Sequence, residues 1–177
     1  MMAMPVYMFT FNAYGSWMPD HKRGFVKKGE GIQKTNPALA KAYRQAAKHA
    51  TVLFDEPTQR FLLCLGHEVC GRRRWRVHGI AAEPTHIHFL VSWANGTDWT
   101  SVRGKLLNIL STGLSKRSGE LGRPWFVDGS SRKRVGDREH FGHLITEYLP
   151  AHDGAKWFEG DAPPPPPTFP DQPPPRA

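Results

Sequence analysis

The sequence predicts an α+β fold, a ferredoxin-like antiparallel sheet with helices packed mainly on one face. Short stretches rich in aromatic and β-branched residues alternate with longer stretches of helix-forming residues. Two of the apolar stretches are separated by a turn of only a few residues, which is typical of an antiparallel hairpin. The order strand, two helices, hairpin, helix, strand, helix then indicates one sheet covered by helices.

The strands are predicted where aromatic and β-branched residues cluster between turn residues. The clearest stretch is P-V-Y-M-F-T-F-N at the start of the chain, and the turn Glu83-Pro84-Thr85 joins the two stretches of the hairpin. The predicted strands cover residues 5–12, 75–82 and 86–93, with weaker strands at 124–127 and 132–135. Residues 20–34 are polar and basic, and we expect them to form a loop.

The helices are predicted from capping residues followed by helix formers or by apolar residues at helical spacing. Asn36-Pro37, Asp55, Thr97 or Asp98, and Asp137 are the expected N-terminal caps. The predicted helices cover residues 38–50, 57–70, 99–117 and 138–149.

The length and composition indicate one folded domain, which we place at residues 1–160. Residues 161–177 are rich in proline and are predicted to be a disordered, extended tail. The 24 lysines and arginines outnumber the 16 acidic residues, giving a net charge of +8. A basic balance of this size is typical of proteins that bind nucleic acid or another anionic surface.

Several classes of protein are disfavoured by the sequence. No apolar run approaches the roughly 20 residues that a membrane helix needs. The first residues lack the charged and apolar regions of a signal peptide, so we expect a cytoplasmic, nucleoid-associated protein without membrane contact. The spacing of Cys64 and Cys70 fits neither a zinc motif nor a CxxC redox motif, and Cys64 is expected to be a buried thiol.

The pair His86 and His88 is the strongest indication of chemistry. The two residues lie in the predicted strand 86–93, and side chains two positions apart on a strand point to the same face. Two imidazoles on one face can share a metal ion, whereas Ile87 and Phe89 would point into the core. Two ordinary surface histidines would give the same pattern, so a third ligand and a reactive group are needed to decide.

Both are present near the end of the chain. Tyr148 and His152 are four residues apart, so on a helix they share one face. With His86 and His88, His152 would give three imidazole ligands, leaving positions open for a phosphate. Tyrosine can act as a covalent nucleophile, but its ordinary pKa near 10 requires activation, which a divalent metal would supply.

This pattern resembles the HUH endonucleases, and most closely the single-tyrosine transposases, namely the IS200-like and REP-associated tyrosine transposases. The most specific likeness is the hairpin R-V-H-G-I-A-A-E-P-T-H-I-H-F-L-V, with proline two residues before the first histidine. The opening V-Y-M-F-T-F-N-A-Y-G-S-W-M-P and the later R-P-W-F-V-D-G-S-S-R-K-R-V are also similar, and the resemblance covers about residues 5–158.

The resemblance implies a metal-dependent enzyme that cleaves and rejoins single-stranded or hairpin DNA through a 5′-phosphotyrosine intermediate. Tyr148 would be the nucleophile, and His86 and His88 would bind Mg²⁺ or Mn²⁺, usually in a homodimer. Relatives commonly have Gln or Asn as third ligand, whereas this chain has His152, which makes Zn²⁺ possible. Pro150 lies between Tyr148 and His152 and is expected to interrupt the helix.

Basic and aromatic residues give the candidate DNA contacts. Phosphate contacts are predicted at two clusters, and Trp17 is the best candidate for stacking on an unpaired base. Most of the other tryptophans are expected to pack in the core, and His78 is a candidate for the core or for supporting the site. Glu83 could be a further ligand or a turn residue, and we favour the turn. The two basic clusters are Arg72, Arg73, Arg74 and Arg76, and Arg132, Lys133 and Arg134.

Two other functions remain open from the residues. One is a DNA- or RNA-binding protein of the same fold that has lost catalysis. The other is a phosphodiesterase that uses paired histidines as acid and base, although such enzymes usually need two separate histidine motifs and this chain has one.

Overall fold

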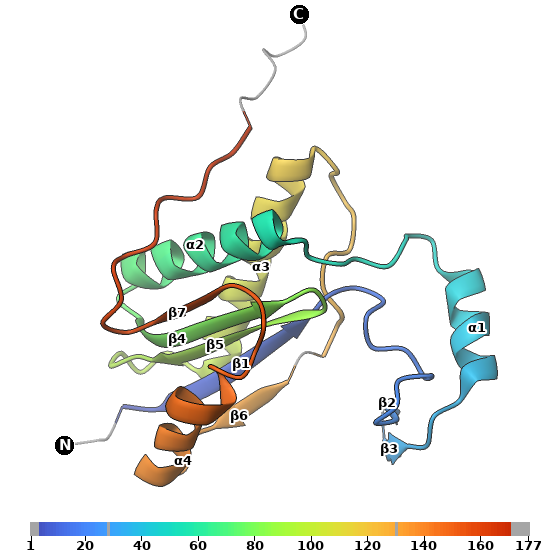
Figure 1. The fold of residues 1–177 in the computed structure, drawn as a ribbon, viewed down its shortest axis with the longest axis horizontal. Helices are drawn as coiled ribbons and strands as arrows, with labels where there is room; N and C mark the ends of the chain where they lie inside the picture. The colour runs from blue at the N-terminus through green and yellow to red at the C-terminus, as the bar shows by residue number, and fades with distance from the viewer. Residues whose placement is uncertain (1–3, 28, 130, 171–177) are drawn as a thin grey trace, which may run out of the picture.

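The computed structural model describes residues 4–27, 29–129 and 131–170, and Figure 1 shows the arrangement of its elements. The helices are α1 (Pro37–Ala46), α2 (Glu56–Arg72), α3 (Trp99–Ser118) and α4 (Arg138–His143), and α4 continues as the π-helical turn η1 (Leu144–Tyr148). The strands are β1 (Val6–Asn12), β2 (Phe25–Lys27), β3 (Gly31–Gln33), β4 (Arg76–Glu83), β5 (His86–Ser92), β6 (Arg132–Arg134) and β7 (Lys156–Phe158).

The main sheet has five strands in the order β6-β1-β5-β4-β7, and all its pairings are antiparallel. Without β7, this is the strand order of a βαββαβ ferredoxin-like unit, in which the two central strands are the first and the third. The predicted α+β fold class is therefore confirmed.

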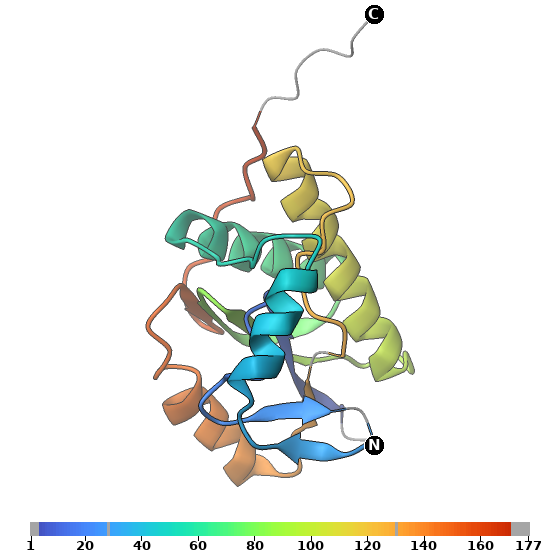
Figure 2. The ribbon, with the colours of Figure 1, turned by 90° about the vertical axis from the view of Figure 1, so that its right-hand side faces the viewer.

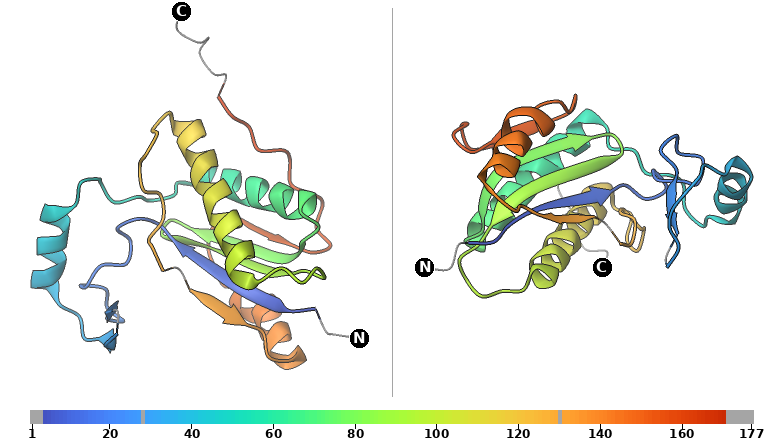
Figure 3. Two further views of the ribbon diagram at one scale, coloured as in Figure 1. Left: turned by 180° about the vertical axis from the view of Figure 1, so that it is seen from behind. Right: turned by 90° about the horizontal axis from the view of Figure 1, so that it is seen from below.

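The two faces of this sheet are covered differently. The long helices α2 and α3 pack on one face, and α4 with η1 lies on the other. In the left panel of Figure 3, α3 crosses in front of the strands and α4 lies behind them. Phe9, Phe11, Ile87 and Phe89 point towards α2 and α3 and are fully buried in the larger core. A small second cluster that includes Met8, Leu90, Leu144 and Leu149 joins α4 and η1 to the opposite face.

The hairpin between β4 and β5 sets the direction of the histidines. Pro84 and Thr85 form its turn, and Glu83 pairs directly with His86. Because side chains alternate along β5, burial of Ile87 and Phe89 on the α2–α3 face turns His86 and His88 to the face that carries η1. A slip of one residue in this register would exchange the two sets, so the core determines the position of the histidines.

The structure departs from the sequence-based prediction in four elements. Residues 20–34 were expected to be a loop, but they contain the hairpin β2–β3, too short and too polar to show a strand pattern. Residues 124–127 do not form a strand, since only Phe126 makes an isolated bridge with Ala13. The first helix ends at Ala46 rather than at residue 50, and the three-residue strand β7 was not predicted.

A polar network fastens β7 to the sheet. The Nδ1 atom of His78 lies 2.9 Å from Glu159, and its Nε2 atom lies 2.8 Å from the hydroxyl of the buried Ser92. Arg76 donates a hydrogen bond to the same carboxylate at 2.6 Å. Burial opposes ionisation of Glu159, but these hydrogen bonds from Arg76 and His78 outweigh it and lower the pKa of the carboxyl. His78 therefore supports the strand that follows the candidate site, which agrees with the expectation of a core or supporting role.

The described part of the predicted tail, up to residue 170, contains no helix or strand beyond an isolated bridge at Asp161. The indole of Trp157 donates a hydrogen bond to the carbonyl oxygen of Ala162, and Phe169 meets Phe61 of α2 edge-on at 5.4 Å between ring centroids. Residues 171–177, also assigned to the tail, lie outside the described residues. Among the residues described, no helix is both long enough and apolar enough to cross a membrane.

Candidate metal and tyrosine site

The segment after α4 brings a tyrosine and a third histidine over the face of the sheet that carries His86 and His88. In η1 the amide of Leu149 donates to the carbonyl of Leu144, five residues back, so the helix widens by one residue before Tyr148. Such π-helical turns are rare and occur frequently at functional sites.

Pro150 ends this helix, as its sequence predicts, but it does not separate Tyr148 from His152. Proline has no N–H group to continue the helical ladder. The chain turns so that the amide of His152 donates to Leu149, while Nδ1 of His152 lies 2.9 Å from the carbonyl oxygen of Tyr148. Lys156 donates to the free carbonyls of Pro150 and His152, which completes the end of the helix.

The three histidines form one cluster. His86, His88 and His152 each offer a ring nitrogen, and these three atoms lie within 4.8 Å of one another. The ring centroids are 4.6 Å apart for His86 and His88, 4.6 Å for His88 and His152, and 5.5 Å for His86 and His152. The structure therefore brings together the three residues that the sequence predicts as metal ligands.

Hydrogen bonds fix which nitrogen of each ring is available. Nδ1 of His88 lies 2.7 Å from the hydroxyl of Thr10, and Nδ1 of His86 lies 3.0 Å from the hydroxyl of Thr85. Nδ1 of His152 is held by the backbone carbonyl of Tyr148 and, more weakly, by that of Leu149. Since the second nitrogen of a ligating histidine is usually held by such a partner, this leaves Nε2 of all three rings to bind an ion.

An unpaired ring nitrogen in the cluster favours a divalent metal as its partner. Among the described residues, Nε2 of His88 is buried and has no hydrogen-bond partner, although His88 is only 3% exposed. An unpaired buried polar nitrogen is costly, and coordination to a cation would satisfy it. Three neutral imidazoles suit a borderline ion such as Zn²⁺ better than Mg²⁺, which prefers oxygen ligands.

Burial keeps the cluster in the protonation state that coordination needs. Loss of solvent around His88, reinforced by the charges of His86 and His152, lowers its pKa to about 3. Burial also lowers the pKa of His86, an effect that the nearby carboxylate of Glu83 partly offsets. Both imidazoles are therefore neutral at pH 7 and can donate a lone pair to a metal.

Tyr148 lies at the edge of this cluster. Its ring centroid is 5.1 Å from that of His152 and 5.5 Å from that of His88, and its side chain remains 38% exposed. Burial raises the pKa of its hydroxyl, and Glu83 raises it further, while the positive charge of Arg23 lowers it. The phenol is therefore protonated at neutral pH and needs activation before it can attack a phosphodiester.

Glu83 lies closer to the cluster than its expected role as a turn residue requires. It is the last residue of β4, and its carboxylate is 3.9 Å from Nε2 of His86. This carboxylate therefore offers an oxygen beside the three nitrogens. Glu83 pairs with His86 across the hairpin, because only Pro84 and Thr85 separate the two residues. This short spacing is the signal in the sequence that could have placed Glu83 beside the cluster.

The first basic cluster lies away from this site. Arg76 begins β4 and Glu83 ends it, so the two are about 23 Å apart at roughly 3.3 Å per residue. Arg76 pairs with Glu159, Arg72 pairs with Glu68, and the guanidinium of Arg73 lies over the ring of Trp75. Contacts of Arg72, Arg73, Arg74 and Arg76 with DNA remain a prediction, and would fall at a distance from Tyr148.

The second basic cluster forms β6, at the edge of the sheet beside β1. All three side chains are exposed, and Lys133 pairs with Met8 on the face that carries the histidines. Arg132 lies on the opposite face, with its guanidinium 3.9 Å from the centre of the Trp99 ring. Phosphate contacts by Arg132, Lys133 and Arg134 remain a prediction, and this cluster is nearer to the site than the first.

The tryptophans differ in burial, and Trp17 differs from Trp93 and Trp125 in the way that the sequence predicts. Trp93 and Trp125 are buried in the core, whereas Trp17 is 42% exposed and stacks on His21 with ring centroids 4.1 Å apart. Trp17 therefore has one covered and one accessible ring face.

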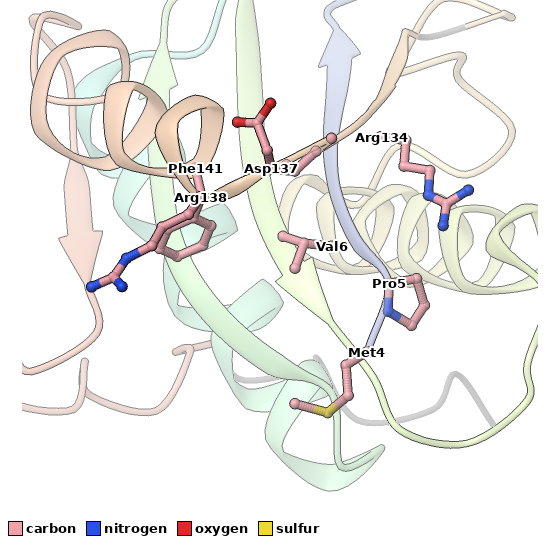
Figure 4. A pocket seen from close by; sticks show the side chains of 9 residues that line it. Met4, Pro5, Val6, Arg134, Asp137, Arg138 and Phe141 are labelled. Carbon is pink, nitrogen blue, oxygen red and sulfur yellow. The ribbon is translucent and has the colours of Figure 1, made fainter. Parts of the chain in front are cut away.

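The histidine cluster lies outside the cavity at the start of β1. That cavity, of about 560 Å³, lies between the start of β1 and the start of α4, and Figure 4 shows the side chains around it. Its lining includes Val6, Arg134, Arg138 and Phe141, but none of the three histidines and not Tyr148. Tyr148, at the edge of the histidine cluster, is 38% exposed, so its ring can be reached from solvent.

Three supporting residues were not predicted from the sequence. Thr10 and Thr85 orient two of the imidazoles, and only the strand register brings Thr10 opposite His88. Gly154 follows His152 at a point where a Cβ atom would overlap the carbonyl of Ala82. A glycine shortly after a ligand was the available signal for a close backbone approach.

Comparisons with known proteins give likeness of structure and none of sequence. No family model matches the chain, and no curated protein matches its sequence. The structure of a REP-associated tyrosine transposase bound to a REP hairpin matches with 12% sequence identity and a TM-score of 0.45. The match covers 82% of this chain and 64% of the transposase, so this chain spans less than two thirds of the length of that protein. A candidate transposase from Deinococcus radiodurans R1 shares 9% identity at a TM-score of 0.46, over 88% of this chain and 95% of that one. Because these TM-scores are below 0.5, the functional assignment rests on the geometry of the site.

Proposed function

We propose that this chain is a metal-dependent single-stranded DNA endonuclease and transposase of the single-tyrosine kind. The observation that supports it is the meeting of a tyrosine with a three-histidine cluster on one face of the sheet. The ring of Tyr148 is about 5 Å from the nearest histidine ring, and part of it is exposed to an incoming strand. Neither a purely structural histidine cluster nor a paired-histidine phosphodiesterase requires a phenol at this position.

The proposed reaction is a transesterification. The hydroxyl oxygen of Tyr148 attacks a backbone phosphorus, forming a 5′-phosphotyrosine bond as the bond from phosphorus to the 3′-oxygen breaks. The phenol gives up its proton, and the departing 3′-oxygen takes one up. The reverse attack by a 3′-hydroxyl releases the tyrosine and rejoins the DNA, so the step conserves the energy of the phosphodiester bond.

The residues around Tyr148 have separate tasks in this reaction. His86, His88 and His152 would hold a divalent cation, which when bound polarises the phosphoryl group and offsets the charge that develops on it. Thr10 and Thr85 hold two of the rings in orientation, since each hydroxyl occupies an Nδ1 atom. The turn at Pro150 fixes His152 beside Tyr148, so the nucleophile and the ligand are positioned by the same backbone segment.

The substrate class follows from the surface and the charge. Tyr148 is partly exposed, and the net charge of +8 favours a polyanion. A single strand can bring its backbone within reach of Tyr148 without the unpairing that a duplex would require. We therefore propose single-stranded DNA, or the unpaired flank of a DNA hairpin, as the substrate.

The test is the formation of a covalent adduct. Purified protein is incubated with a pool of end-labelled hairpin DNAs that carry single-stranded flanks, with Mn²⁺, and analysed on a denaturing gel. We expect a labelled band at the mass of protein plus DNA, which EDTA abolishes. Tyr148→Phe should lack the band but bind the DNA as tightly as the wild type.

Each other outcome contradicts the proposal in a definite way. An adduct that persists in Tyr148→Phe would assign the nucleophile elsewhere. Absence of any adduct, with binding retained, would indicate a DNA-binding protein that has lost catalysis. Cleavage without an adduct and without a metal requirement would favour histidines acting as acid and base.

A further inference from the structure

A basic lobe projects from the end of the sheet that carries the candidate site. We define the basic lobe as residues 14–52, which contain β2, β3 and α1. Figures 1 and 2 show it as an extension beyond the sheet and the two long helices, from the side and end-on respectively. The expectation from sequence was an unstructured basic loop at the start of this segment.

The lobe is attached at the turn that precedes His86. At its start, the amide of Ala13 and the hydroxyl of Ser16 donate to the carbonyl of Thr85, at 2.8 and 3.1 Å. Just after its end, the amide of Phe54 donates to the carbonyl of Pro84 at 2.8 Å. Both ends of the lobe are therefore fastened to the hairpin turn beside the metal cluster, which fixes the position of the lobe relative to the site.

The lobe carries most of the excess charge of the chain. It contains eight lysines and arginines against two acidic residues, a net charge of +6 out of the total of +8. The two acidic residues are already paired, Glu30 with Lys27 and Asp20 with Arg44. Within the described part of the lobe, five exposed cations have no recorded acidic partner: Lys22, Arg23, Lys34, Lys41 and Lys48.

An aromatic platform lies at the base of the lobe, near these cations. Trp17 and His21 stack with an interplanar angle of 16°, and the indole leaves its other face accessible. Lys22 and Arg23 follow His21 directly in the chain. Base-stacking aromatic rings next to cations that contact phosphates are the usual elements of a single-strand binding surface.

The lobe contributes little to the hydrophobic core. Within the lobe, among the residues whose burial is described, the buried apolar side chains are Pro19, Ala40 and Val52. Ile32, in the middle of β3, is 80% exposed. A segment of this length that orders itself with so little buried apolar surface is better explained by a binding role than by stabilisation of the fold.

We propose that the basic lobe binds the single-stranded DNA that flanks the cleavage point, with Lys22 and Arg23 on its phosphates and Trp17 stacked on one of its bases. This inference rests on the proposed function, because it takes the strand at Tyr148 to continue along the lobe. A second copy of this chain fits less well, since two lobes of charge +6 would repel each other.

The test compares two double variants of equal charge. Lys22→Gln with Arg23→Gln removes two cations from the lobe. Lys105→Gln with Lys116→Gln removes two exposed cations from α3, on the opposite face of the sheet. Binding of a fluorescein-labelled oligothymidine is measured by anisotropy between about 50 and 200 mM salt.

We expect the lobe variant to bind more weakly, with a slope of log K against log salt shallower by about 1.4, because each phosphate contact on a single strand contributes about 0.7. The α3 variant should retain the wild-type slope. Trp17→Ala should weaken binding about ten-fold without changing the slope, since stacking carries no charge. Trp17→Phe should restore most of the affinity.

The outcomes separate this inference from the proposed function. A wild-type slope in the lobe variant, with the covalent adduct still formed by the wild-type protein, overturns the inference and leaves the function intact. A changed slope without any adduct in the wild-type protein supports the lobe and rejects the nuclease. Unchanged DNA binding together with a change in the mass measured by light scattering would make the lobe an interface between copies of the chain, which also overturns the inference.

Discussion

At the scale of single residues, the Nδ1 hydrogen bonds of the histidines determine what the site can bind. Thr10, Thr85 and the backbone at Tyr148 each hold one ring, which leaves three Nε2 atoms for an ion. Three imidazoles form a softer donor set than two imidazoles and an amide oxygen. If the cluster binds a metal as proposed, we expect the identity of residue 152 to control which ion it prefers.

Replacing His152 by Gln tests this control. We expect His152→Gln to weaken Zn²⁺ binding by at least about ten-fold, because one of three nitrogen ligands is lost, and to improve the affinity for Mn²⁺ or Mg²⁺ relative to Zn²⁺. Competition titrations with a chromophoric chelator measure both effects. His143→Gln is the matched control, because His143 lies on the same helical segment but is exposed and pairs with Glu147. Equal Zn²⁺ affinity in His152→Gln and the wild type would remove His152 from the site.

Burial of His88 also predicts how stability depends on pH. Its pKa is about 3 in the folded protein against an ordinary value near 6.5, so the unfolded chain binds the proton more strongly. The contribution of His88 is therefore fully present above pH 6.5 and is lost as the pH falls from 6.5 towards 3. The free energy of unfolding of the metal-stripped protein should decrease across this range by up to about 1.4 kcal/mol per pH unit on account of His88.

Urea unfolding followed by circular dichroism at several pH values measures this dependence. His88→Gln cannot take up the proton, so its stability should vary less steeply between pH 6.5 and 4 than that of the wild type. Identical slopes in the two proteins would mean that His88 is not a buried neutral imidazole.

At the scale of elements, the end of α4 is the part that assembles the site. The π turn, Pro150 and the return of the chain to β7 bring His152 beneath Tyr148 within a few residues. Gly154 allows this return, because its backbone lies against the carbonyl of Ala82 at the end of β4. The position of the third ligand thus depends on a residue that has no chemical role itself.

Gly154→Ala should therefore damage both stability and metal binding. The added methyl group would overlap Ala82 and Gln59, and such overpacking typically costs about 1–3 kcal/mol. We expect a lower urea midpoint and weaker metal binding, because the shift reaches His152 two residues earlier. Gly104→Ala on α3, where an added methyl group meets nothing within 4 Å, should be neutral or slightly stabilising. If Gly154→Ala behaved like Gly104→Ala, the close approach at Ala82 would not constrain the site.

The elements also show which features a single sequence can predict. Strands β1, β4 and β5 and helices α2 and α3 were recognisable because long periodic apolar patterns follow from burial against one core. Strands β2, β3 and β7 have three residues each, too few to show a period, and were not predicted, whereas the equally short β6 was predicted only as a weak strand at 132–135. Thr10 could not be recognised as a partner of His88, because 78 residues separate them in sequence.

The site was predictable for a different reason. The pair His86 and His88 is local, and the offset between Tyr148 and His152 is local, so each half can be identified without knowledge of the fold. Their meeting is a property of the fold, since it requires β5 and the segment after α4 to share one face of the sheet. The sequence also indicated that Pro150 would end the helix, but it could not show that the following turn returns His152 to the cluster.

At the scale of the whole molecule, the large hydrophobic core and the candidate site lie on opposite faces of the sheet. One face carries the large core with α2 and α3, and the other carries the histidines, Tyr148 and the small cluster beneath α4. The basic lobe extends from the same end as the site, and the basic strand β6 lies at the neighbouring edge. A homodimer, which the resemblance to single-tyrosine transposases implies, stays a prediction.

The most direct test of the central claim is to locate the covalent bond. The protein–DNA adduct formed with Mn²⁺ is digested with nuclease and trypsin, and the peptides are analysed by mass spectrometry. We expect a nucleotide joined through its 5′-phosphate to Tyr148. A nucleotide on any other residue, or a protein that cleaves DNA while every peptide containing Tyr148 remains unmodified, would contradict the account.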